Sequence, residues 1–353
     1  EHLQLRETCA IADLTAFVVF DVTGPKALDV VQHSVVRQMD VAVGKTIYTP
    51  VLAPNGGFKA DLTVMRLGKN HFRVVTGGAH GMADKKAFAN NLPADGTAHI
   101  SDLTSGMATI GLWGPNARKV LESITTDDVS NEGFPFASNR LIEIGNLRVL
   151  ASRISYVGEL GWELYLPVET AVALWDMIWE AGAVHGLIAA GSGATAGTGR
   201  LEKSYRAYGN ELETSYNMVE AGMVFPKVKA QDFVGKQAYV KHRSEEPIAI
   251  LCSLFIDDHT SSTGEKRYPL GWEPIVTREG ELLIDSKGRR SFANSAGSAP
   301  SLGKHLVMSY LPPEYAKVGQ ELAIEYMGDR LPCTVALVGS KPLFDPENER
   351  VRS

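Results

Sequence analysis

Hydrophobic and polar residues alternate along several stretches of this chain, and other stretches repeat apolar residues at helical spacing. Because successive side chains of a strand point to opposite faces, alternation predicts strands that are buried on one face. The strands predicted in this way cover residues 57–67, 72–76, 140–144, 148–155 and 162–166. Helical spacing predicts a helix over residues 171–181, which Gly182 ends, and a second helix over residues 200–208.

One pattern occurs twice. Residues 22–31 and 112–121, which lie 90 positions apart, each predict a strand ending in glycine, a proline at the first helical position, and an amphipathic helix. A loop and further strands follow each copy, so the sequence predicts two related α+β units. We expect these units at residues 1–104 and 105–244.

The pattern changes after Arg243. Short β-type runs separated by turn residues predict a small β-barrel or sandwich over residues 245–353. The runs cover residues 248–255, 281–285, 305–310, 321–326 and 333–338. The predicted class is therefore α+β, with two mixed units and a β tail.

Composition and charge narrow the class of protein. The chain has 353 residues, of which 44% are hydrophobic and 22% charged, as expected for a globular protein of two or three domains. Its net charge of −6 and its lack of long Lys/Arg runs argue against nucleic acid as a partner. No apolar run approaches the roughly 20 residues that span a bilayer, so we expect no membrane contact.

Cysteine usage and the chain start bear on the compartment. Cys9, Cys252 and Cys333 are far apart and lack ligand spacing, which favours reduced thiols over a structural metal and predicts a cytoplasmic location. The first residues show no signal peptide, and the chain begins without methionine in what reads as the middle of a helix. We therefore expect the first unit to be incomplete at its N-terminus.

Residues 155–166 carry the densest chemistry of the chain, a glycine turn with two carboxylates that leads into an alternating strand. Gly158 and Gly161 permit backbone conformations and close approaches that a side chain would block. The strand period places Glu163 on the face opposite Trp162. A fixed carboxylate suits a ligand with adjacent N–H donors, and the alternative is a solvated hairpin with surface glutamates.

A second carboxylate, Asp61, lies in a predicted strand between apolar neighbours, after a glycine turn at residues 54–57. If this carboxylate is buried, it is poorly solvated and can serve as the electrostatic partner of a cation or as a proton carrier. The alternative is an aspartate at a strand edge that faces water.

The glycine-rich run 191–196 formally matches the G-x-G-x-x-[GA] dinucleotide fingerprint. A dinucleotide site also needs a second parallel strand with an acidic residue, whereas Glu211 and Glu213 fall in a polar loop. The sequence therefore does not predict a nucleotide site. It also lacks a phosphate-binding loop, a hydrolase elbow and a zinc-protease helix motif.

Several motifs occur together and in one order: Asn55-Gly56-Gly57 with Asp61-Leu62, Gly114-Pro115, Tyr156 to Leu164, Arg200-Leu201-Glu202-Lys203, and Asp232 to Ala238. Together they resemble the glycine-cleavage T-protein (aminomethyltransferase) family over most of the chain. Residues 153–165 and 310–314 are more similar to the folate-binding part of dimethylglycine and sarcosine dehydrogenases.

The resemblance implies a clover-leaf of two ferredoxin-like α+β units and a β-barrel around a central tetrahydrofolate channel. It implies that Glu163 accepts hydrogen bonds from the amino and ring N–H groups of the pterin. It also implies that Tyr156 and Phe136 pack on the folate, with Tyr48 and Thr76 near it.

Asp61 matches the catalytic aspartate of the family, which would orient the folate nitrogen that accepts the one-carbon unit and stabilise positive charge there. Trp113 has a flat face suited to stacking on a conjugated ring, but at a strand end it could equally be core. Family members carry an Arg-Asp pair before Arg200, where this chain has Thr195-Ala196 in a glycine run with one residue more.

The resemblance implies one-carbon transfer and leaves the donor open. A demethylase would move a methyl group from an O-, S- or N-methyl small molecule to tetrahydrofolate, which is our first expectation if the chain is the whole enzyme. The folate half of a dehydrogenase would form 5,10-methylene-tetrahydrofolate and need a flavin dehydrogenase domain or subunit, since the chain has no flavin fingerprint. Glycine cleavage with a lipoyl carrier protein and a non-catalytic folate module are further alternatives.

Overall fold

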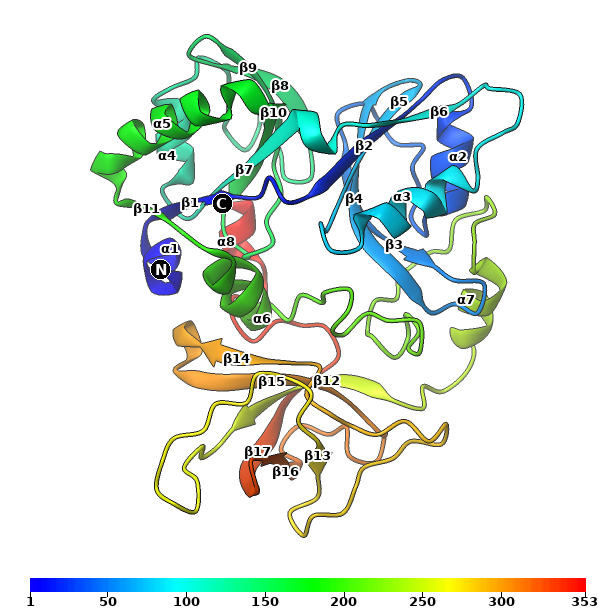
Figure 1. The fold of residues 1–353 in the computed structure, drawn as a ribbon, viewed down its shortest axis with the longest axis vertical. Helices are drawn as coiled ribbons and strands as arrows, with labels where there is room; N and C mark the ends of the chain where they lie inside the picture. Colours follow the sequence, from blue (N-terminus) through cyan, green and yellow to red (C-terminus); the bar gives the residue numbers. More distant parts are fainter.

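A computed structural model describes residues 1–353 and shows three lobes, each built on one β-sheet (Figure 1). The first two lobes combine a sheet with helices, and the C-terminal lobe is a sheet of six strands. The predicted α+β class is therefore confirmed. None of the helices combines the length and the apolar character needed to cross a bilayer.

The first sheet has the strand order β3-β4-β5-β2-β6, and all of its neighbouring strands are antiparallel. Its strands are β2 (Val18–Thr23), β3 (Thr46–Leu52), β4 (Phe58–Gly68), β5 (His71–Thr76) and β6 (His99–Asp102). Helices α2 (Ala27–Ser34) and α3 (Gly81–Ala89) cover its outer face (Figure 1). A core that includes Phe20, Phe72 and Phe88 fills the space between sheet and helices.

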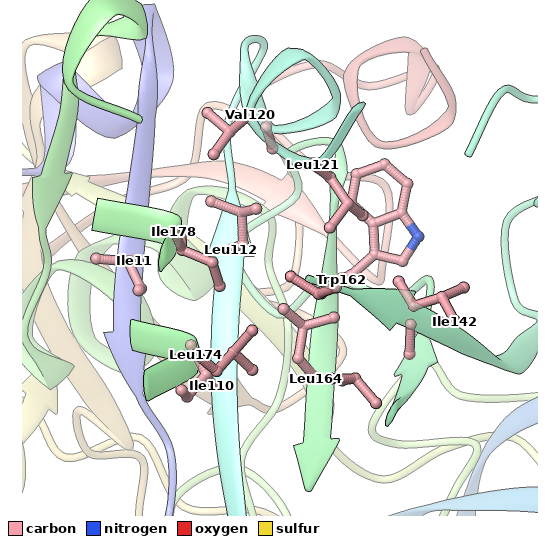
Figure 2. Packing of buried hydrophobic residues seen from close by; sticks show 14 of the residues in the cluster. Ile11, Ile110, Leu112, Val120, Leu121, Ile142, Trp162, Leu164, Leu174 and Ile178 are labelled. Atoms are coloured by element: carbon pink, nitrogen blue, oxygen red, sulfur yellow. The ribbon is translucent and has the colours of Figure 1, made fainter. Parts of the chain in front are cut away.

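The second sheet has the strand order β11-β1-β7-β10-β9-β8. Its strands are β1 (Cys9–Asp13), β7 (Met107–Trp113), β8 (Asn139–Ile144), β9 (Leu147–Ser152), β10 (Gly161–Pro167) and β11 (Leu187–Ala189). Helices α4 (Ala117–Glu122) and α5 (Ala171–Gly182) cover it. Figure 2 shows the core beneath them, where Trp162 and Leu164 lie in one cluster with Leu174.

The two sheets repeat one arrangement, as the sequence pattern predicts. The spatial order β3-β4-β5-β2 of the first sheet matches the order β8-β9-β10-β7 of the second. The helices after the two glycine-proline motifs begin at Ala27 and Ala117. Pro25 and Pro115 therefore precede their helices by two residues, and do not occupy the first helical position as predicted.

Strand β1 departs from this repeat. It pairs antiparallel with β7 and parallel with β11, so it lies inside the second sheet. The sequence pattern places residues 9–13 in the first unit, but Cys9 and Ile11 are fully buried in the core of the second. The chain thus starts in the second lobe, crosses to the first and returns. The division at residues 104 and 244 otherwise stays a prediction.

The C-terminal sheet has the strand order β13-β16-β17-β12-β15-β14. Its strands are β12 (Ile250–Ile256), β13 (Ile275–Val276), β14 (Ser295–Ala299), β15 (Lys304–Leu311), β16 (Glu321–Tyr326) and β17 (Asp329–Val338). The strand predicted over residues 281–285 is wrong, because Leu282 and Ile284 make single bridges and are nearly half exposed. The other strands predicted in this tail are confirmed.

The glycine-rich run folds as a π-helix, Gly193–Gly199, that continues into the short helix α6 (Arg200–Glu202). This corrects the helix predicted over residues 200–208, because Ser204 has a φ of 53°, which ends helical backbone. A π-helix closes its hydrogen bonds over one residue more than an α-helix, so this conformation could accommodate the extra residue that the resemblance implies, which stays a prediction. The remaining helices are α1 (His2–Glu7), α7 (Lys236–His242) and α8 (Glu349–Arg352).

A buried group of charges joins α1, α6, the glycine turn and the C-terminal helix α8. The guanidinium of Arg6 lies 2.9 Å from Glu159 and 3.2 Å from Glu202. Arg350 lies 2.7 Å from Glu159, and His2 lies 3.1 Å from Glu202. Because a buried charge is tolerated only when it is paired, this network fixes the turn to both ends of the described chain.

Arg6→Ala tests this network. The substitution should lower the free energy of unfolding by about 3 kcal/mol, the low end of the range for breaking a buried ion pair, because other cations remain beside the carboxylates. Urea unfolding measures the change. Arg148→Ala, at an exposed arginine of β9, should change the same quantity by less than about 0.5 kcal/mol. Equal losses in the two variants would contradict the role given to the network.

Candidate functional site

Asp61 lies in the middle of β4, as predicted, and its carboxylate is held by two hydrogen bonds. The hydroxyl of Tyr48 donates to Oδ2 at 2.8 Å, and the backbone N–H of Tyr208 donates to Oδ1 at 3.2 Å. Burial raises the pKa of Asp61 to about 6, although both hydrogen bonds favour the charged form. The group can therefore exchange a proton close to neutral pH.

Two of the predicted phenols lie close to this carboxylate. Burial, followed by the nearby charge of Asp61, raises the pKa of both Tyr48 and Tyr156. Tyr156 donates its hydroxyl to the carbonyl of Arg206 at 3.1 Å, and its ring stacks on that of Tyr205. Tyr48 keeps 40% of its surface exposed. The structure thus brings Asp61, Tyr48 and Tyr156 together.

Thr76 reaches this group through another acid. Its hydroxyl donates to Oδ2 of Asp84 at 2.5 Å, so the hydrogen bond of this side chain is used within the protein. Asp84 is buried in α3, and its burial raises its pKa. The charge of Asp84 also contributes to raising the pKa of Asp61. Asp84 is therefore a second buried acid, whose charge acts on Asp61.

Glu163 lies in β10, between Gly111 of β7 and Ser152 of β9. Only 5% of its surface is exposed, so the interpretation as a solvated surface glutamate is wrong. Burial raises the pKa of Glu163 to about 7, and the hydroxyl of Tyr165, which donates to Oε2, opposes that rise. Trp162 points into the opposite core, as the strand period predicts.

The first two sheets meet at an apolar seam, which we define as the cluster of Val19, Met65, Val75, Leu150 and Tyr165. The first three of these residues belong to the first sheet and the last two to the second. Tyr165 therefore brings the strand that carries the buried glutamate to the contact between the two units.

The glycines of the turn are required by space, as predicted. A Cβ on Gly161 would lie 2.0 Å from the carbonyl oxygen of Leu112. Gly158 has a φ of +79°, and a Cβ there would lie 2.5 Å from the side chain of Lys203. Larger residues at either position would displace the backbone that leads into β10.

The two remaining predicted residues differ in exposure. Trp113 is 1% exposed, lies in a core cluster with Val157 and donates its indole N–H to the carbonyl of Ile154 at 3.0 Å. This position corresponds to the core alternative and corrects the stacking role. Phe136 is 39% exposed, and the residue after it accepts a hydrogen bond from the backbone of Thr46 in the first sheet.

The sequence did not single out three residues of this region: Tyr165 and Asp84, which act through their side chains, and Tyr208, which acts through its backbone N–H. The strand period places Tyr165 on the face of Glu163, so this residue could have been found. Tyr208 reaches Asp61 from 147 residues further along the chain, and no local pattern signals such a contact.

Open cavities of about 420 and 570 Å³ lie elsewhere, in the C-terminal sheet. The first is lined by His259, Tyr268 and His305 among others, and neither includes a residue of the group around Asp61 or Glu163. The chain contains no grouping of three or more His, Cys, Asp or Glu residues that could hold a metal ion. We therefore locate the candidate site by the raised pKa values of Asp61 and Glu163 and not by the volume of a cavity.

Family profiles match most of the chain. The profile described as GCVT N-terminal domain matches residues 1–229, and the profile described as glycine cleavage T-protein C-terminal barrel domain matches residues 270–345. Among solved structures, the glycine cleavage system aminomethyltransferase T from Bartonella henselae superposes with a TM-score of 0.80. It is 21% identical and covers 95% of this chain and 87% of its own, which shows a shared fold.

Curated relatives fall into two groups by length. Mitochondrial dimethylglycine dehydrogenase of Homo sapiens is 32% identical, and the match covers 100% of this chain and 39% of that protein. 4-Methylaminobutanoate oxidase (formaldehyde-forming) of Paenarthrobacter nicotinovorans is 31% identical, and the match covers 100% of this chain and 40% of that protein. An aminomethyltransferase of Halothermothrix orenii is 29% identical over 92% of this chain and 86% of its own length.

Tyr48→Phe tests the contact at Asp61. The substitution removes a hydrogen bond that favours the charged carboxylate, so the pKa of Asp61 should rise, by about one pH unit if the bond contributes about 1.5 kcal/mol. Infrared titration of the carboxyl band, identified by its loss in Asp61→Asn, measures the midpoint. An unchanged or lower midpoint would show that the phenol does not stabilise the carboxylate.

Proposed function

This chain belongs to the glycine-cleavage T-protein family, and we propose that it is a tetrahydrofolate-dependent one-carbon transferase. Tetrahydrofolate is the cofactor of this family. The reaction that we propose first moves a methyl group from an O-, S- or N-methylated small molecule to tetrahydrofolate. The observation that carries the proposal is the carboxylate of Asp61 in β4, which accepts a hydrogen bond from Tyr48 beside Tyr156 and whose pKa burial raises to about 6.

The residues present fit this cofactor. Tyr165 engages Oε2 of Glu163, and no hydrogen bond within the chain engages Oε1. Adjacent N–H donors of a pterin need such a carboxylate acceptor. Tyr156 and Phe136 would contact the folate, and Tyr48 would lie beside it. We place Thr76 behind Asp61, since Asp84 accepts its hydrogen bond.

Tetrahydrofolate supplies the nitrogen nucleophile that takes up the one-carbon unit. As a carboxylate, Asp61 would stabilise positive charge next to it and accept a proton. As an acid, it would return that proton to the leaving atom of the methyl donor. A pKa of about 6 suits both roles, because neither protonation state is far from reach at neutral pH.

The extent of the matches favours a second candidate. The chain spans about two fifths of the length of dimethylglycine dehydrogenase and of 4-methylaminobutanoate oxidase. In this candidate the chain is the folate-binding half of a flavin-dependent dehydrogenase and forms 5,10-methylene-tetrahydrofolate. The partner would be a flavin dehydrogenase domain or subunit, and the donor would be the one-carbon unit released by amine oxidation.

Product analysis separates the two candidates. The purified chain should bind tetrahydrofolate in a calorimetric titration. On incubation with methylated amines, sulfonium compounds and methoxy-aromatics, one donor should yield 5-methyl-tetrahydrofolate by mass spectrometry. Formation of 5,10-methylene-tetrahydrofolate only when a flavin dehydrogenase and its amine are added would support the second candidate. Absence of folate binding would overturn both.

Substitution of the two carboxylates should separate transfer from binding. Asp61→Ala should abolish turnover while folate affinity stays within a few fold. Glu163→Ala should weaken folate binding by ~1.5–3 kcal/mol, the range for hydrogen bonds to charged groups. Calorimetry and turnover assays on both variants measure the difference. Equal and small effects of the two substitutions would place the site elsewhere.

A further inference from the structure

Glu163 and Tyr165 lie two residues apart in β10, so their side chains share one face of the sheet. The hydroxyl of Tyr165 donates to Oε2 of Glu163. Tyr165 is 1% exposed and belongs to the seam, and Glu163 is 5% exposed. Because the hydroxyl of Tyr165 is shielded from bulk water, its hydrogen-bond partner is the carboxylate of Glu163.

The surroundings of Glu163 offer no other charge to balance its own. Its strand neighbours Gly111 and Ser152 carry none. Of the charged groups of the first sheet, Arg73 acts on Tyr165: burial raises the pKa of this phenol, and the charge of Arg73 opposes that rise. Arg73 donates to both oxygens of Asp21, at 2.8 and 3.0 Å, and His71 lies 2.7 Å from the same carboxylate. Asp21 therefore balances the charge of Arg73, and the hydroxyl of Tyr165 is the hydrogen-bond donor to Glu163.

We propose that Tyr165 is a positioning residue, which holds Oε2 of Glu163, favours the ionised form of the carboxyl and leaves Oε1 for the ligand. In consequence, uptake of folate is coupled to the ionisation of Glu163. This inference rests on the proposed function, since the ligand is the folate that Glu163 would accept. It adds a residue and a pH dependence that the role of Glu163 alone does not contain.

The direction of the pH dependence follows from the burial of Glu163. Burial raises the pKa of Glu163 to about 7, so the carboxyl is largely protonated below that pH and ionised above it. A protonated carboxyl offers a donor where the pterin also presents donors, so affinity should fall as pH falls through about 7. Loss of the phenol removes a bond to the charged form and should move this fall to higher pH.

The first sheet contains a comparable pair. Tyr48 donates to Asp61 at 2.8 Å, across the strands β3 and β4. In both units a tyrosine thus donates to the carboxylate proposed to act on the ligand. The pairs differ in exposure, since Tyr48 is 40% exposed and Tyr165 is 1% exposed. Water therefore has less access to the hydrogen bond between Tyr165 and Glu163 than to the one between Tyr48 and Asp61.

Tyr165→Phe tests the inference, with Tyr239→Phe as the matched control. Tyr239 is also 1% exposed and its hydroxyl accepts hydrogen bonds from the backbone of Phe225 and from Arg243, in a different core. Tetrahydrofolate affinity is measured by calorimetry from about pH 6 to about pH 9. The wild type and Tyr239→Phe should lose affinity below about pH 7. Tyr165→Phe should bind about tenfold more weakly at neutral pH and recover at the alkaline end.

A second readout needs no folate. The infrared carboxyl band of Glu163, identified by its loss in Glu163→Gln, should titrate at higher pH in Tyr165→Phe than in the wild type. If Tyr165→Phe does not fold, 3-fluorotyrosine at position 165, a stronger donor of nearly the same shape, should move the midpoint to lower pH. An unchanged midpoint, or a loss of affinity that is equal at every pH, overturns the role of Tyr165. Absence of binding by the wild type overturns the proposed function instead, and the infrared titration still decides on Tyr165.

Discussion

Two buried glutamates, Glu159 in the glycine turn and Glu202 in α6, require cations from distant parts of the chain. Glu159 meets Arg6 and Arg350, and Glu202 meets Arg6 and His2. Loss of Arg6, which both glutamates share, would weaken both pairings, although Arg350 and His2 would remain beside the carboxylates. The turn that starts β10 is therefore positioned by helices at both ends of the described chain. The geometry of the candidate site depends on this closure.

The site places two acids in surroundings that oppose their ionisation. Burial raises the pKa of Asp61 to about 6 and the pKa of Glu163 to about 7. A hydrogen bond from the hydroxyl of Tyr48 or Tyr165 limits the rise of each pKa, so neither pKa lies far from neutral pH. We attribute proton exchange to the first acid and ligand acceptance to the second. Burial in the sheets raises the pKa of each acid, and the hydrogen bond from the tyrosine lowers it again.

Local patterns predicted what strand period and turn chemistry determine. The strand of Asp61, the position of Glu163 on the face opposite Trp162 and the repeat of two units were all predicted from the order of residues. Contacts between distant segments were not predicted, because the residues next to them in the sequence carry no pattern that indicates such a contact. The pairing of β1, the core position of Trp113 and the contact of Tyr208 belong to this group. The helix predicted after Arg200 failed because the backbone of Ser204 ends it.

The position of β1 has a consequence for the order in which the lobes fold. The first sheet draws all its strands from residues 18–102, so it can close once that stretch has emerged during synthesis. The second sheet pairs Cys9 with Leu187, so its edge cannot form until a much longer stretch is made. Closing so long a loop is slow, and β1 must remain unpaired with β11 meanwhile. The first lobe can thus fold before the second sheet has all its strands, and the last pairing of the second sheet then forms beside a folded first lobe.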